Sequence, residues 1–239
     1  MKIKSKAKVE SSGKKITSIF KRPVWTTYPA IIACLQNQRE SKIHPKNQNL
    51  HLYEKNRGLN ATIILLSALT IEGFLVDCLS CFTMGSEFSP MNSFESRLNH
   101  AFRKITDRAT FGEFQELFRI ALGAPLSEMI KDKKLIEGIK ALINFRNGLA
   151  HARSVVYKTY EIDLEQEVDY EVESQYAEVH TYLKKLNLVY KEEDFYINKI
   201  ADHFADLVKP YINAVIPLLP VPQSDNVIAL VRFAYTRTI

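Results

Sequence analysis

A long, mostly apolar stretch runs from Ala61 to Phe82 and directly follows Asn60. It is too long for a strand, and as a helix it would be apolar on most of its sides, which is typical of a central helix covered by others. We therefore predict a helix over about 60–83. The preceding segment, 44–58, is rich in Asn and Lys and ends at a glycine, so it is predicted to be a polar connection.

Apolar residues recur at steps of three and four in later segments, which is the spacing of one helix face. This spacing predicts amphipathic helices over about 94–105 and 114–122. Another helix begins after either Ser127 or Asp132, since both residue types can cap a helix. Its apolar stripe consists of Leu135, Ile139, Leu142 and Phe145.

The pattern changes over about 153–175, where Val, Tyr and Thr are frequent and apolar residues then alternate with acids. A small hairpin inserted between helices and irregular structure are the two alternatives for this segment. Helices are predicted again over 176–186 and 192–216, whereas 226–235 is compatible with a strand or a helix. The predicted fold is therefore mainly all-α, a helical bundle with a small, acidic, β-prone insertion.

Three regions follow from these patterns: a basic N-terminal arm at 1–22, a helical domain at 23–217 and a tail at 218–239. The hydrophobic share of 46% and the charged share of 25% are close to ordinary globular usage, which argues against a wholly disordered chain. Only 8 of 239 residues are glycine, which favours helices over a turn-rich β architecture.

Several features indicate an intracellular protein with no membrane span. Glu72 and Asp77 lie inside the apolar stretch, and each would cost about 3 kcal/mol at the centre of a bilayer. The 3 cysteines form no even disulfide framework, and the N-terminus lacks the apolar core of a signal peptide. We therefore expect a reducing, cytoplasmic setting. Cys78 and Cys81 have the spacing of half a zinc site, but core packing is favoured because no second pair accompanies them.

Charge is unevenly distributed along the chain. The basic arm can follow a phosphate backbone, and Lys14 and Lys15 are its candidate RNA contacts. The segment from Glu161 to Glu178 is acidic and contains no Lys or Arg, so it could occupy a basic groove. The alternative for both is a frayed tail and a solvated face.

Arg146, Asn147 and His151 are concentrated where the amphipathic helix reaches Gly148. This grouping suits cleavage of RNA by attack of the ribose 2′-OH on the adjacent phosphorus. A histidine titrates near neutral pH and can transfer the proton, while an arginine stabilises negative charge on the phosphate oxygens. The amide of Asn147 can orient a ribose hydroxyl or the catalytic side chains. The scheme requires no metal and no other cofactor. The alternative is a helix C-terminus stabilised by basic side chains.

Arg146 and His151 would point about 140° apart on an unbroken helix, because five residues advance by about 500°. Two arrangements could bring them together. The helix could bend or end near Gly148, or a second copy of the chain could complete the site across a two-fold axis. We favour the two-fold arrangement.

The run from Phe145 to His151 resembles the Arg-(x4 to x6)-His signature of HEPN domains, including the polar residue after the arginine. The resemblance implies an α-helical domain that dimerises through the Arg146/His151 face. It also implies a metal-independent ribonuclease of the toxin, antiphage or CRISPR effector kind, which would act on RNA and could have an antitoxin or defence-system partner. Some HEPN proteins instead act as scaffolds or ligand binders, so the alternative for this chain is a non-catalytic module that binds nucleic acid or a protein partner.

Two further site residues follow from the resemblance. Some members carry a catalytic glutamate on an earlier helix, and Glu72 is the candidate here. Its alternative is a buried carboxylate paired with an arginine, which could itself be Arg146. Where certain toxins carry a tyrosine two residues after the histidine, this chain has Arg153, which is a candidate for phosphate binding.

Overall fold

Helices make up most of the part of the chain that the structure describes. The computed structural model describes residues 23–39, 50–84, 104–105, 109–150, 156–160, 169–173, 176–189, 195–220 and 223–235. The elements are η1 (Val24–Thr27), α1 (Tyr28–Asn37), α2 (Leu50–Met84), α4 (Phe111–Leu122), α5 (Leu126–Met129), α6 (Lys133–Ala150), β1 (Val156–Tyr160), β2 (Asp169–Glu173), α7 (Tyr176–Lys185), α8 (Asn198–Val215), η3 (Ile216–Leu218) and α9 (Gln223–Tyr235).

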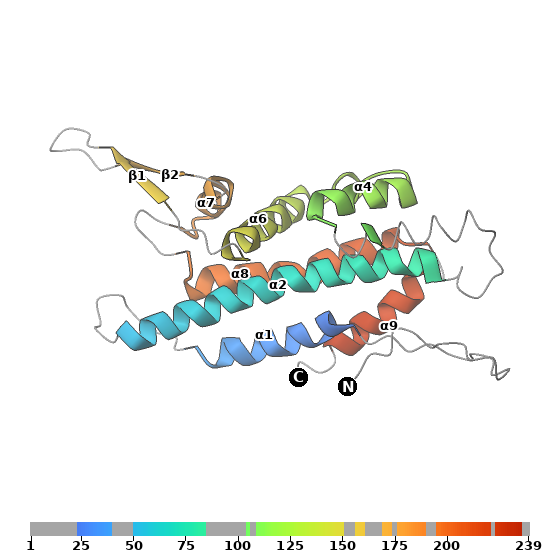
Figure 1. Cartoon of the computed structure of the whole chain (residues 1–239), viewed down its shortest axis with the longest axis horizontal. Helices are drawn as coiled ribbons and strands as arrows, with labels where there is room; N and C mark the ends of the chain where they lie inside the picture. The colour runs from blue at the N-terminus through green and yellow to red at the C-terminus, as the bar shows by residue number, and fades with distance from the viewer. Residues whose placement is uncertain are drawn as a thin grey trace.

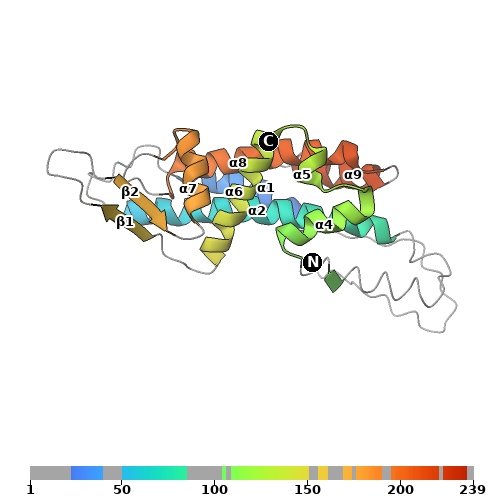
Figure 2. The same ribbon diagram turned by 90° about the horizontal axis from the view of Figure 1, so that it is seen from above.

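Helix α2 is the centre of the bundle and contacts α1, α4, α6, α8 and α9. Helix α8 runs beside it, α1 and α9 lie on one side of the pair, and α4 and α6 lie on the other (Figures 1 and 2). Its apolar residues face neighbours in several directions, and Ile63, Ile71, Phe74 and Leu75 are fully buried. The mainly all-α prediction is therefore confirmed.

The N-terminal part of α2 differs from the prediction, because the expected polar connection is already helical at residue 50. Leu, Glu, Lys and Arg in its first turns are good helix formers, so a polar stretch can still be helix. Asn60 is buried in the helix interior. Its Nδ2 donates to the Tyr196 carbonyl oxygen at 2.6 Å and to Asn198 Oδ1 at 2.9 Å, while its Oδ1 accepts from Arg39 Nη1 at 2.9 Å.

The helices before the candidate site follow the predicted pattern. Helix α4 covers the predicted 114–122 segment and begins at Phe111. Of the two candidate starting points for α6, Asp132 is the cap, since its Oδ1 accepts from the Leu135 backbone N–H at 3.0 Å. Ser127 lies in the short helix α5. Of the predicted 94–105 helix, only Lys104 and Ile105 are described, both as helix.

The β-prone segment contains an antiparallel hairpin of β1 and β2, with Val156 opposite Glu173 and Tyr160 opposite Asp169. The hairpin extends away from the bundle beyond α7 (Figure 1). After α7 and α8 the chain forms α9, so 226–235 is helix rather than strand. Helix α9 packs against α2, α1 and η1, and its Val227 is fully buried.

One helical stretch among the described residues, Glu54–Ser80, is long and apolar enough to cross a membrane by length and composition alone. In the structure, 61% of this stretch's most apolar window is buried by other parts of the chain. A core helix passes the same test, so the packing of α2 accounts for its apolar character.

Candidate functional site

The last turns of α6 are fixed by aromatic packing around Phe145. This side chain is fully buried. Its ring centroid lies 5.7 to 5.8 Å from those of Tyr176, Phe195, Tyr196 and Phe204, which come from α7, the segment before α8 and α8 itself. Aromatic pairs at this separation stabilise beyond their buried area. Because Phe145 is held inside the core, the next residue, Arg146, has its direction set by the bundle.

Arg146 reaches from α6 to α2, where it forms an ion pair with Glu72. Its Nη1 also donates to Asn147 Oδ1 at 2.8 Å. The Arg146 and Glu72 side chains are 24% and 15% exposed, so the pair is partly shielded from water. The ion pair is the alternative that the sequence offered to a catalytic role of Glu72. It brings three of the candidate site residues together.

The guanidinium of Arg146 keeps hydrogen-bonding capacity beyond this chain of contacts. It has five N–H donors, and the described residues accept from it in two hydrogen bonds. Its Nε is buried and has no partner among these residues, so a ligand cannot reach it in this conformation. Nη1 and Nη2 each carry a second N–H, and the side chain is 24% exposed, so these two atoms can take an additional acceptor such as a phosphate oxygen.

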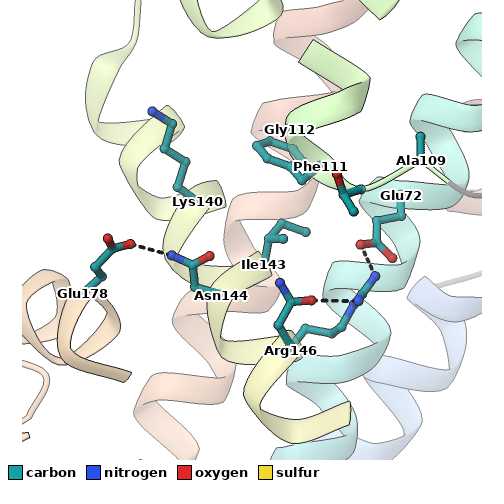
Figure 3. Close-up of a pocket in the computed structure, with 11 residues that line it drawn as sticks. Glu72, Ala109, Phe111, Gly112, Lys140, Ile143, Asn144, Arg146 and Glu178 are labelled. Atoms are coloured by element: carbon teal, nitrogen blue, oxygen red, sulfur yellow. Dashed lines mark hydrogen bonds and ion pairs between the residues drawn. The ribbon is translucent and has the colours of Figure 1, made fainter. Parts of the chain in front are cut away.

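Glu72, Arg146 and Asn147 line a pocket of about 430 Å³, which is within the size range of small-ligand sites. Figure 3 shows the Glu72–Arg146 pair at one end of this pocket and Lys140, Asn144 and Glu178 toward the other. The remaining lining residues are Ala109, Thr110, Phe111, Gly112 and Ile143.

The α4 side of the pocket is set by a capping box. Thr110 Oγ1 accepts from the Glu113 backbone N–H at 3.4 Å, and Glu113 Oε2 accepts from the Thr110 N–H at 2.6 Å. These two bonds define where α4 begins. Hydrogen bonds to the carboxylate, first from the Thr110 backbone N–H and then from the Thr110 side chain, lower the pKa of Glu113. The capping box places Phe111 and Gly112, the first two helical residues, at the pocket.

The α6 side of the pocket is a stripe of Lys140, Ile143, Asn144 and Asn147. These residues are spaced by three and four positions, so they share one face of the helix. Asn144 Nδ2 donates to Glu178 Oε2 of α7 at 2.7 Å. Sequence reasoning found Asn147 but missed Lys140, Asn144 and Glu178. The stripe was visible in the spacing along α6, whereas the partner on α7 had no local signal.

Gly148 lies inside α6 and is not the residue at which the helix ends. The helix continues through Gly148 to Ala150. A Cβ atom at Gly148 would lie 2.4 Å from Cζ and the hydroxyl oxygen of Tyr176, so only glycine allows this close approach. Within the described residues, α6 is helical through Gly148 to Ala150, so it has no break at Gly148 itself.

The other predicted site residues, His151, Arg153, Lys14 and Lys15, lie outside the described residues. The described His180 and His203 lie on α7 and α8 and do not line this pocket. No cluster of three or more potential metal ligands occurs in the described part of the chain. Cys78 is fully buried in the apolar core. Protein-family models, curated proteins and solved structures show no match to this chain.

Proposed function

We propose that this protein is a metal-independent endoribonuclease of HEPN type. The observation that carries the proposal is the joined group of Glu72, Arg146 and Asn147 in the wall of a ligand-sized pocket. An arginine oriented by a carboxylate and an amide is suited to stabilise the negative charge that develops on a phosphate during cleavage. His151 follows directly after α6 in the sequence and supplies the proton transfer.

In the proposed reaction, neutral His151 accepts the proton of the ribose 2′-OH while O2′ attacks the adjacent phosphorus. The O2′–P bond forms and the P–O5′ bond breaks. Arg146 of the other copy stabilises the phosphate oxygens in between, and the departing O5′ takes up the proton that His151 accepted. The products are a 2′,3′-cyclic phosphate and a 5′-hydroxyl end. In a cell, such an enzyme would act as a toxin or an antiphage effector.

Incubation of total RNA in EDTA tests this proposal. We expect the wild type to cleave, and His151→Ala and Arg146→Ala to lose at least about 100-fold in rate. Arg119→Ala is the matched control, because Arg119 is an exposed arginine of α4 that does not line the pocket. Mass spectrometry should find cyclic phosphate ends. Cleavage that is unchanged in His151→Ala would refute the proposal.

A non-enzymatic module that binds nucleic acid is the second candidate. The Glu72–Arg146 ion pair favours this candidate. Glu72 compensates the charge of Arg146, and such an arginine can stabilise the fold and contribute to binding without taking part in catalysis. RNA binding without cleavage, weakened by Arg146→Ala and unaffected by His151→Ala, would establish this alternative.

A further inference from the structure

The pocket has a second polar group at the end away from Arg146. Glu178 accepts a hydrogen bond from Asn144 at 2.7 Å, and Lys140 lies one helical turn before Asn144 on the same face of α6 (Figure 3). The pocket therefore holds two acids and two bases: Glu72 with Arg146 at one end, and Glu178 with Lys140 at the other. Such a balance suits a ligand with an anionic part and a neutral, hydrogen-bonding part.

Two apolar side chains, Phe111 and Ile143, also line the pocket. Ile143 is 4% exposed, so it forms part of the floor. A nucleobase needs this combination of an aromatic or aliphatic surface for its face and polar groups for its edge. RNA bound with a phosphate at Arg146 would have an adjacent base within this part of the pocket.

Glu178 is held in place from two directions. Two residues before it, Tyr176 is fully buried, and its ring packs against Phe145 and over Gly148 of α6. On the pocket side, the Asn144 amide orients its carboxylate. A carboxylate has about four acceptor positions, so the bond from Asn144 leaves room for two more donors.

Among the four RNA bases, guanine presents two adjacent donors, N1–H and the N2 amino group, which match the two oxygens of a carboxylate. Its O6 lies beside them and accepts from a cation such as Lys140. Adenine presents one donor beside an acceptor on the same edge, so it would leave one carboxylate oxygen facing a lone pair. The chemistry at this end of the pocket therefore favours guanine.

We propose that Glu178, positioned by Asn144 and assisted by Lys140, selects guanine in the RNA next to the phosphate that Arg146 binds. This specificity rests on the proposed ribonuclease function, and it predicts cleavage beside guanine. Phe111 and Ile143 provide the surface that contacts the base.

The test uses uridine-rich oligonucleotides with 2′-O-methyl groups, which lack the attacking hydroxyl and cannot be cleaved by this route. One central position carries guanine, adenine, cytosine or uracil, and dissociation constants are measured by fluorescence anisotropy at one salt concentration. We expect the guanine oligonucleotide to bind about tenfold more tightly than the adenine one. Glu178→Gln should abolish this ratio, because an amide replaces one acceptor by a donor. Glu137→Gln, at an exposed position of α6 outside the pocket, should preserve it.

Equal dissociation constants for the guanine and adenine oligonucleotides would overturn the proposed subsite. A preference for guanine that is unchanged in Glu178→Gln would also overturn it. Cleavage in EDTA is scored separately on unmodified RNA. Cleavage without guanine selection removes this subsite and leaves the ribonuclease proposal standing. Selective binding of guanine without cleavage would refute the ribonuclease proposal and leave the guanine subsite standing.

Discussion

Arg146 has two roles in the proposed site. Its guanidinium would bind a phosphate, and it also compensates the charge of Glu72. If Arg146 is replaced by Met, Glu72 keeps a partly buried charge without its cation, and we expect a loss of about 1–3 kcal/mol in the free energy of unfolding. The double variant Glu72→Gln/Arg146→Met should lose less than the sum of the two single variants. Urea denaturation measures all three. Additive losses would show that the ion pair contributes nothing to stability.

His203 provides a pH-dependent contribution to stability. Burial lowers its pKa below the ordinary value of 6.5, although Asp206 acts in the opposite direction. The Tyr182 hydroxyl lies 2.8 Å from its Nε2, and burial raises the Tyr182 pKa to about 12. Because the unfolded chain takes up a proton more readily than the folded protein, stability is highest above about pH 7 and falls as the pH drops through about 6.5.

We therefore expect the melting temperature to decrease between about pH 7.5 and pH 5.5. His203→Asn should reduce that decrease. Part of it should remain, because the pKa of His180 is also lowered, first by burial and then by Lys184. A variant with the same pH profile as the wild type would exclude His203 as a source of the effect.

At the level of single residues, the sequence can indicate that a buried charged side chain needs a partner of opposite charge. A carboxylate in an apolar helix needs a cation, and Arg146 was the partner considered in the alternative interpretation of Glu72. Phe114 and Phe118 are buried in the core, whereas Phe111 is only partly buried against it. Phe111 lies at the start of α4 and contributes to the pocket, a position that helical spacing alone could not distinguish.

Among the elements, α6 is predicted well on its apolar face and less well at its end. The stripe from Leu135 to Phe145 is buried as expected. Gly148 was interpreted as a signal for the end of the helix, since glycine often ends helices. In the structure, a glycine is required at this position because the ring of Tyr176 packs against it. This contact joins residues that are far apart in sequence, so a local pattern cannot predict it.

Two alanine substitutions compare Gly148, which is packed against Tyr176, with Gly58, which has open space around it. Gly148→Ala should destabilise the protein by about 1–3 kcal/mol, because its Cβ would overlap Tyr176 and displace α7. Gly58→Ala is the matched control. It lies in α2 with no atom within 4 Å of the added Cβ, so it should stabilise by up to about 1 kcal/mol. Thermal and urea unfolding provide the comparison, and equal effects of the two substitutions would contradict the packing role of Gly148.

For the molecule as a whole, the continuity of α6 up to Ala150 bears on assembly. Because α6 has no break at Gly148, we favour the two-fold arrangement, in which Arg146 of one copy meets His151 of another. The dimer is a proposal that rests on this geometry.

Complementation between inactive variants tests that arrangement. Arg146→Ala and His151→Ala, each inactive alone, should regain about a quarter of wild-type cleavage when their subunits exchange freely. Half of the dimers are then mixed, and one of the two sites in each mixed dimer has both residues. Co-expression with two different tags allows the mixed dimer to be isolated. Cleavage no higher than that of the separate variants would argue against a site shared between copies.

The continuity of α2 has a consequence for recognising distant relatives of this chain. Asn60, in the polar network with Arg39, and Glu72, at the pocket, are twelve residues apart on this one helix, or about 18 Å. A single inserted residue between them would turn Glu72 by about 100° away from Arg146. Sequences that share this site should therefore align across 60–72 without gaps, so that a constant spacing from asparagine to glutamate becomes a search criterion alongside the Arg146 motif.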